Sequence, residues 1–367
     1  MKQLSKILTI AVIATALAAC NKEVPKPDTD PAPTARTVTA EQLDYSTGAA
    51  QKPRYLVCDG GKVYVSCGYP PAILRIDTVS GTIDRMLKFN TDYDLEGIAV
   101  AGNKLFAASS FIRTESGSTK YDSIVMVVDL ATFSLDTVLN VPTDPRLIKA
   151  VDANHVVVAC GYDVVGGTGP LATSALIDAT TCQVTPLGHG MNSIDTYNGL
   201  VYSFSGGYSD AVEYYCLNPL TNSRSTILDG CNIDDPYGIN ILDGNIFLTT
   251  HSYYYEPGDV VRFNSDNSVM WRSMAGMLPS KVVPLADGTA YVLNEGNWGQ
   301  NEASLSRVDM TTGSITNNVF STANGRGLGD LAQDLVVYGT KAYITVSFSN
   351  TVEIVDISDN TSRQIRL

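Results

Sequence analysis

The side chains best suited to chemistry in this chain are aromatic rings that recur at one place in a repeat. Each ring follows the middle residue of a short apolar stretch by five to seven positions, where a loop should leave a strand. Such rings can stack on a flat ligand, or they can seal the junctions between neighbouring units, and both interpretations stay open for the set. The seven rings are Tyr69, Phe111, Tyr162, Tyr208, Tyr253, Trp298 and Phe348, and Tyr254 adds to the fifth position.

Groups for catalysis or metal binding are sparse. The three histidines, His155, His189 and His251, do not have the spacing of metal ligands, and only His251 begins an aromatic loop, where it could contact a ligand. The sequence has no Gly-x-Ser-x-Gly, phosphate-loop or Cys-x-x-Cys motif. We therefore predict that the protein is not an enzyme and holds no cofactor and no metal.

The elements that must position the rings are strands of a repeat with a spacing of 42 to 52 residues. The first unit has strands at Arg54–Cys58, at Val63–Cys67 and at Ile73–Asp77. In every unit the third strand ends in a short polar side chain, which we interpret as a turn former that bonds its own backbone rather than as part of a metal site. These residues are Asp77, Asp129, Asp178, Asn218, Asn264, Asp309 and Asp356.

Seven units of this kind predict an all-β fold, a seven-bladed β-propeller of four-stranded antiparallel blades. Fourth strands are expected at residues 82–89, 314–320 and 362–367. Because the last unit has its own fourth strand, the pattern does not predict ring closure by a swapped strand, although residues around Arg36–Thr39 could add one. The glycine-rich residues 325–329 look like a phosphate loop but should form a tight turn between two blades.

The loops between second and third strands vary in length, whereas the turns on the opposite side are short. Variation in loop length on one side of a repeat array marks the binding face, so we place a ligand there. The long loops are residues 109–123, 160–173, 250–259 and 294–304.

The first 52 residues have the composition of a leader and a tether. Lys2 and Lys6 precede an apolar run at Ile7–Ala19, which predicts a signal peptide over residues 1–19. Leu17–Cys20 resembles a bacterial lipobox, so Cys20 is the predicted lipidation site and the lipid is the only membrane attachment. Residues 20–52 form a predicted proline-rich tether, and residues 53–367 form the propeller.

Charge and cysteine content narrow the classes of partner. The net charge of −13 argues against nucleic acid, and solubility alone explains it at least as well as recognition does. Acidic residues soon after Cys20 loosely resemble the export signal of surface lipoproteins of Bacteroidota, which predicts the outer membrane and the cell surface as the location. The six later cysteines lack the spacing of a disulfide framework and should pack as small hydrophobic residues.

A distinctive string, Asn294-Glu295-Gly296-Asn297-Trp298-Gly299, resembles the surface-layer-type, YncE-like propeller lipoproteins of Bacteroidota. This group includes the BtuG-type lipoproteins, and the resemblance implies a cobalamin-like corrinoid as ligand and a TonB-dependent outer-membrane transporter as partner. In those relatives the string opens the propeller, whereas here it falls in the sixth unit, so ligand contacts transfer poorly.

The predicted site combines the aromatic rings with polar groups that could bond the amides of a corrinoid edge. These polar groups are Asn294, Glu295, Asn297, Arg326 and Asp330. Extended glycans would use the same side chains. The alternative function is therefore a surface-layer or glycan- and protein-interaction module without a small-molecule ligand.

Overall fold

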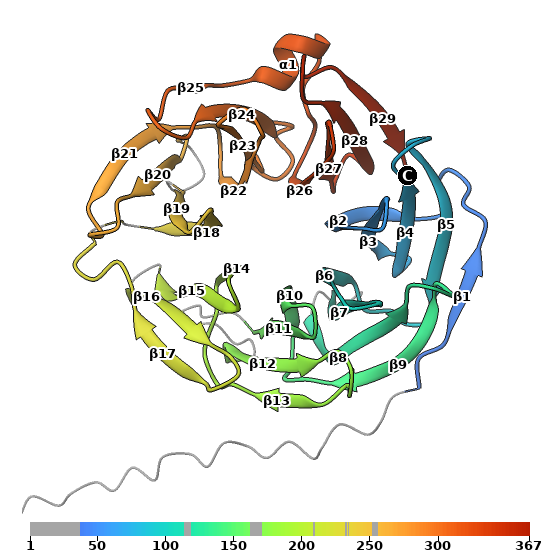
Figure 1. Ribbon diagram of the computed structural model, residues 1–367. Coiled ribbons are helices and arrows are strands. Elements are labelled where there is room, and N and C mark those ends of the chain that lie inside the picture. Colours follow the sequence, from blue (N-terminus) through green and yellow to red (C-terminus); the bar gives the residue numbers. More distant parts are fainter. Residues whose placement is uncertain are drawn as a thin grey trace, which may run out of the picture. The chain divides into compact units, whose positions relative to one another are not determined.

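The structure is a computed structural model that describes residues 37–113, 119–161, 171–207, 210–231, 233, 235–251 and 256–367. The described chain from Thr37 forms seven antiparallel sheets around a central axis (Figure 1). The predicted seven-bladed β-propeller is confirmed. The predicted signal peptide, Cys20 and the residues up to Arg36 lie outside the described residues.

In each blade the strands follow chain order from the axis to the rim. Blade one is β2 (Gln51–Asp59), β3 (Lys62–Tyr69), β4 (Ala72–Asp77) and β5 (Thr82–Phe89); blade two is β6 (Leu95–Ala101), β7 (Lys104–Arg113), β8 (Thr119–Asp129) and β9 (Ser134–Asn140). Blade three is β10 (Pro145–Asp152), β11 (His155–Cys160), β12 (Thr173–Asp178) and β13 (Val184–Pro186); blade four is β14 (Ser193–Tyr197), β15 (Leu200–Gly207), β16 (Asp210–Asn218) and β17 (Ser223–Thr226). Blade five is β18 (Pro236–Leu242), β19 (Asn245–Thr250), β20 (Asp259–Phe263) and β21 (Val269–Met274); blade six is β22 (Pro279–Pro284), β23 (Thr289–Asn294), β24 (Ser304–Asp309) and β25 (Ile315–Thr316). Blade seven is β26 (Ala332–Tyr338), β27 (Lys341–Val346), β28 (Thr351–Asp356) and β29 (Ser362–Arg366).

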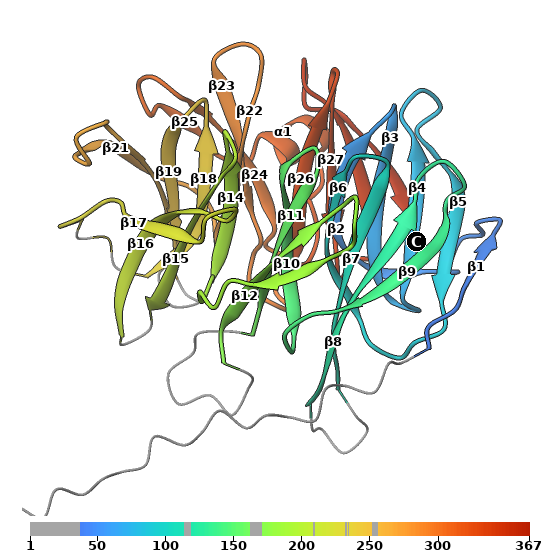
Figure 2. The same ribbon diagram turned by 60° about the horizontal axis from the view of Figure 1, so that its bottom comes forward.

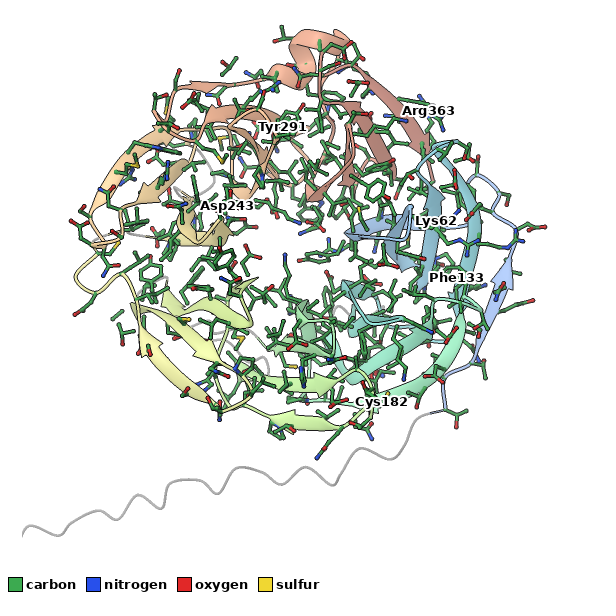
Figure 3. All side chains as sticks on the ribbon, viewed as in Figure 1. Lys62, Phe133, Cys182, Asp243, Tyr291 and Arg363 are labelled. Carbon is green, nitrogen blue, oxygen red and sulfur yellow. The ribbon has the colours of Figure 1, made fainter. Side chains whose placement is uncertain are left out.

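The core lies between neighbouring blades, which explains why the second and third strands are apolar along their length. Each sheet is covered on both faces, so residues that point to either side are buried. One cluster joins Phe106 and Val127 of blade two to Val156 and Ile177 of blade three. Side chains fill the spaces between blades around the ring (Figure 3), and the labelled Tyr291 is fully buried between blades six and seven.

The turns after the third strands form as predicted. The carboxylate of Asp77 accepts hydrogen bonds from the backbone N–H groups of Val79 and Ser80, at 3.1 and 2.8 Å. Asn264 differs, because its side-chain amide bonds the Ser268 hydroxyl instead. The side chains of five other residues likewise accept from a backbone N–H two or three positions further along the chain: Asp129, Asp178, Asn218, Asp309 and Asp356.

The folded domain begins earlier than the predicted residue 53. Strand β1 (Ala40–Leu43) pairs with β5 and becomes a fifth, outermost strand of blade one. The predicted extra strand therefore exists close to residues 36–39, but it covers a rim instead of completing the last blade. Because β29 is the fourth strand of blade seven, no strand is exchanged between the first and last blades among the described residues.

Blades one and seven are joined by side chains and by a shared core. The Tyr45 hydroxyl donates to the Arg366 carbonyl at 3.1 Å, and the Thr345 hydroxyl donates to the Arg54 carbonyl at 2.6 Å. The Leu56 N–H donates to the Asp334 carboxylate at 2.8 Å. A mixed hydrophobic cluster of the two blades lies beside these bonds, so side chains and a shared core close the seam between them.

The fourth strand of blade six is much shorter than predicted. It stops at Thr316, and helix α1 (Val319–Asn324) takes the place of its second half at the rim (Figure 1). Asn318 has a φ of 61°, which breaks the extended backbone, and Phe320 is buried in the hydrophobic cluster shared by blades six and seven. Gly325 ends the helix with a φ of 64°, so the glycine-rich segment is a turn as predicted. No helix in the described part of the chain is long and apolar enough to cross a membrane.

Candidate functional site

A large cleft opens where second strands of four blades end. Its volume is about 1340 Å³, and it runs from the rim at β1 to the inner strands of blades one and two. Four of the predicted aromatic residues line it, one from each of blades one, two, six and seven: Tyr69, Phe111, Trp298 and Phe348. The structure therefore gathers these four rings at one side of the ring axis instead of spreading them around it.

Three of these rings are exposed to an extent that packing between blades does not require. The exposed fractions are 69% for Trp298, 64% for Tyr69 and 45% for Phe348. Among the described residues Tyr338 is the other exposed aromatic side chain, and it does not line the cleft. The ring centroids of Trp298 and Phe348 are 5.7 Å apart, which is the separation of an interacting aromatic pair. These rings are available to a ligand.

Phe111 is placed differently from the other three. It lies within β7 and pairs with Tyr121 of β8, in a hairpin that projects beyond its neighbours on one face (Figure 2). The Arg146 guanidinium lies over the Phe111 ring, 5.1 Å from its centroid. Phe111 is half-buried, so it supplies a wall of the cleft.

Asp330 holds the two loops that carry Trp298 and Phe348. Its carboxylate accepts from the Gly299 N–H at 3.1 and 3.0 Å, next to Trp298 in the chain. Its backbone carbonyl accepts from the Phe348 N–H at 3.2 Å, and its own N–H donates to the Ser349 hydroxyl at 2.9 Å. The sequence predicts Asp330 as a ligand contact, whereas the structure gives it a positioning role.

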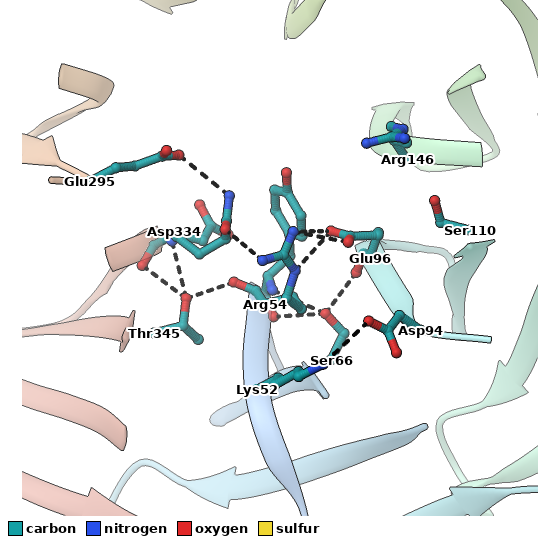
Figure 4. A network of polar contacts seen from close by, with 12 residues as sticks. Lys52, Arg54, Ser66, Asp94, Glu96, Ser110, Arg146, Glu295, Asp334 and Thr345 are labelled. Atoms are coloured by element: carbon teal, nitrogen blue, oxygen red, sulfur yellow. Dashed lines mark hydrogen bonds and ion pairs between the residues drawn. The ribbon is translucent and has the colours of Figure 1, made fainter. Parts of the chain in front are cut away.

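The inner end of the cleft is a charged network that the sequence patterns did not identify (Figure 4). The Arg54 guanidinium donates to both Glu96 oxygens at 2.9 Å and to the Gln333 side chain at 2.8 Å. Burial lowers the pKa of Arg54, but the Glu96 carboxylate outweighs it and raises this pKa above its usual value. A charged residue directly beside the apolar run of a first strand is the sequence signal that could have revealed Arg54 and Glu96.

Glu295 belongs to this network and not to the cleft wall. It is 6% exposed, and its carboxyl group accepts from the Tyr237 hydroxyl at 2.6 Å and from the Gln333 amide at 3.3 Å. Burial raises the pKa of Glu295 to about 7, although the bond from Tyr237 lowers it. Because these two bonds occupy its oxygens, the predicted role as a ligand contact finds no support in this geometry.

A second charged layer lies further along the inner strands. Lys281 pairs with Asp334, and Lys149 lies 3.4 Å from Asp195. Burial lowers the pKa of Lys281, even though the Asp334 carboxylate opposes this shift. The positive and negative groups of this layer are paired with one another, so the layer offers no single-sign site for a charged ligand.

The remaining predicted polar residues are engaged elsewhere. Asn294 is fully buried, and its amide bonds the Gly276 N–H and the hydroxyls of Ser304 and Ser306. The Asn297 amide donates to Glu302 at 3.1 Å inside its own loop. Arg326 pairs with the buried Glu353 at 2.7 Å, away from the cleft. The predicted residues Tyr162, Tyr208, Tyr253 and Tyr254 lie outside the described residues.

The cysteines and the histidine at the aromatic loop add no reactive centre. The six cysteines after Cys20 are free thiols, and burial raises the pKa of Cys67 and Cys160. His251 packs edge-on against Tyr237, with ring centroids 5.5 Å apart, and burial lowers its pKa. Within the described ranges no group of three or more His, Cys, Asp or Glu residues could hold a metal ion.

Comparisons with known proteins define the fold only. No family model matches the chain, and no curated protein sequence matches it. The structure of Kuenenia stuttgartiensis hydrazine synthase has a TM-score of 0.61 at 14% identity, over 86% of this chain and 98% of that one. The Swd1 β-propeller domain of Myceliophteria thermophila has a TM-score of 0.55 at 7% identity, over 88% of this chain and 98% of that one. Dihydro-heme d1 dehydrogenase NirN has a TM-score of 0.53 at 11% identity, over 85% of this chain. This chain spans 65% of that protein, just under two thirds of its length. At such identities the likeness shows a propeller and decides neither for nor against an enzyme.

Proposed function

We propose that this protein binds a ligand in the cleft without changing it chemically, and that the ligand is large, with flat surfaces and polar edges. The observation that carries the proposal is the convergence of Tyr69, Trp298 and Phe348, three exposed rings from three blades, on one cleft. Exposed apolar surface gathered in one concave place is typical of a binding site. The volume of about 1340 Å³ exceeds the roughly 300–1,000 Å³ of common small-ligand pockets, which favours a large ligand.

The ligand we propose is cobalamin or a related corrinoid, bound by a lipid-anchored protein of the cell surface and passed to a TonB-dependent outer-membrane transporter. A corrinoid has a broad apolar plane and a fringe of amides, which match aromatic walls above a charged floor formed by Arg54 and Glu96. The lipobox-like string at Leu17–Cys20 and the resemblance carried by residues 294–299 support the setting. Co-purification of the lipidated protein with such a transporter from outer membranes tests the delivery step.

Equilibrium dialysis of the mature protein against cyanocobalamin tests the binding step. We expect binding at micromolar protein, and we expect Trp298→Ala to weaken it about thirtyfold, as truncation of an aromatic anchor commonly does. Tyr338→Ala is the matched control, because it removes an exposed ring outside the cleft and should leave affinity unchanged. Absence of any retained cyanocobalamin would rule out the corrinoid, and equal losses in the two variants would rule out this cleft.

An extended glycan is the second candidate ligand. The wall of the cleft near the rim carries the carboxylates of Glu41, Asp92 and Asp94, which can accept hydrogen bonds from sugar hydroxyls. Retention on a glycan array, lost in Trp298→Ala and kept in Tyr338→Ala, would favour this ligand. Binding of cyanocobalamin and of no glycan would exclude it.

A further inference from the structure

We propose that Lys52 and Asp94 form a polar clamp in the cleft that recognises a neutral group with a hydrogen-bond acceptor and a donor on neighbouring atoms. A carboxamide or a pair of adjacent hydroxyls has this chemistry. The inference rests on the proposed binding function and names the part of the ligand that the aromatic rings do not explain. Both residues line the cleft, one from blade one and one from the start of blade two.

Asp94 is the partly buried carboxylate of this region with unused capacity, whereas Glu41 and Asp92 are exposed. The neighbouring Glu96 accepts from the Arg54 guanidinium, and the buried Asp144 accepts from Ser110 and Arg146. Within the described part of the chain, the Asp94 carboxylate accepts no hydrogen bond, and its nearest cation is the Lys52 ammonium at 4.0 Å. A carboxylate that is only 21% exposed and has acceptor sites left over is suited to a ligand donor.

The backbone holds Asp94 firmly in this place. Its N–H donates to the Phe111 carbonyl and its carbonyl accepts from the Ser110 N–H, both at 3.0 Å. Gly68, next to Tyr69, leaves room for the carboxylate, since a Cβ atom there would come within 3.2 Å of the Asp94 carboxyl carbon. The carboxylate is therefore fixed between the strands that supply two of the aromatic walls.

Lys52 is held in a left-handed backbone conformation at the same site. Its φ of 53° lies in the left-handed region, which costs free energy for a residue other than glycine. The side chain of Asn350, from blade seven, accepts a hydrogen bond from the Lys52 N–H at 2.9 Å and keeps it there. The side chain is 48% exposed, so its ammonium group can reach a ligand. The same left-handed backbone recurs just before the first strands of four other blades, at Asp144, Asp235, Leu278 and Leu331, so the blade repeat itself positions Lys52.

The separation of the two groups decides which ligand chemistry fits. A closed ion pair in this protein, Lys62 with Asp77, has its charged atoms 2.7 Å apart, whereas Lys52 and Asp94 are 4.0 Å apart. A ligand carboxylate would be repelled by Asp94, and a ligand ammonium would be repelled by Lys52. A neutral amide can accept from Lys52 and donate to Asp94 at the same time, and adjacent hydroxyls can do the same.

Titrations of the mature protein with cyanocobalamin and, separately, with glycans retained on an array test the clamp. Lys52→Met and Asp94→Asn should each lower the affinity for the bound probe about tenfold, the range of one hydrogen bond to a charged group. The double variant should lose little more affinity than either single variant. Lys62→Met, which breaks an ion pair outside the cleft, is the matched control and should bind as the wild type does.

The pH profile separates recognition from a structural effect. Burial raises the pKa of Asp94 to about 6, and the groups that act on it are Lys52, Glu96 and Arg54. Affinity of the wild type should therefore fall below pH 6, and this fall should be absent in Asp94→Asn. Wild-type affinity in both clamp variants, together with a loss in Trp298→Ala, would overturn the clamp and leave the proposed function standing. Failure of the wild type to bind either kind of probe would overturn both.

Discussion

Replacement of Glu295 by Gln gives the sharpest test of the charged network. Glu295 is 6% exposed, and burial raises the pKa of its carboxyl group from 4.5 to about 7. Glutamine has almost the same shape and can still bond Tyr237 and Gln333, but it has no charge to bury. Each unit of difference between the folded and unfolded pKa corresponds to about 1.36 kcal/mol, so this carboxyl changes the free energy of unfolding by about 3 kcal/mol between its two protonation states.

The direction of this pH dependence follows from which state, folded or unfolded, binds the Glu295 proton more tightly. The folded protein does, so the contribution of Glu295 is favourable below about pH 4.5 and is lost as the pH rises through about 7. Urea denaturation at pH 5 and pH 8 should therefore show the stability of Glu295→Gln relative to the wild type rising by about 2.5 kcal/mol over this interval. Comparison of the two proteins cancels the other titrating groups, including His251, whose lowered pKa gives the opposite slope.

A second variant checks the cause of the shift. The Tyr237 hydroxyl donates to Glu295 at 2.6 Å and holds its pKa down, so Tyr237→Phe should make stability fall more steeply between pH 5 and pH 8. Parallel curves for the wild type and Glu295→Gln across this range would refute the reasoning, because they would show that the carboxyl titrates alike in the folded and unfolded states.

Two further predictions concern the aromatic loops and the core. Asp330→Ala should free the loop of Trp298, lower the affinity for the bound probe and cost only about 1 kcal/mol of stability. Titration and urea denaturation of one preparation would measure both effects. Unchanged affinity would contradict the positioning role of Asp330. Tyr343→Ala should lower the free energy of unfolding by about 3–5 kcal/mol because Tyr343 is fully buried, whereas Trp298→Ala should cost well under that amount; similar losses would mean that Trp298 packs as a core residue.

The blade pattern could be predicted because its signals are local. The apolar second strands and the polar residue that ends each third strand depend on a few neighbouring residues, and the turn at Asp77 formed as expected. Strand β1 has the sequence Ala-Glu-Gln-Leu, which carries no strand pattern, and it forms because the rim of blade one offers an unpaired edge. Helix α1 replaced a predicted strand because Asn318 adopts a left-handed backbone and Phe320 finds a buried place.

The site was predicted only in part, for a physical reason. Spacing in the repeat places an aromatic residue at the end of each second strand, but the length and direction of the following loop decide where the ring points. Polar residue types do not distinguish a ligand contact from an internal hydrogen bond, as the fully buried Asn294 shows. The floor residues Arg54 and Glu96 come from neighbouring blades, and Arg54 meets Gln333 of blade seven only when the ring closes, so no local pattern brings the three together.

The position of the cleft at the closing seam links recognition to the stability of the ring. Trp298 and Phe348 come from the last two blades, and Tyr69 and Phe111 come from the first two. No shared strand joins these halves in the described part of the chain, and residues 52–56 of β2 both bond blade seven and form the inner end of the cleft. Side-chain bonds and a shared core already join the first and last blades. A ligand held between Trp298 and Tyr69 would add a further connection across this seam. Because it binds the closed ring and not the open chain, its binding free energy adds to the closure of the seam.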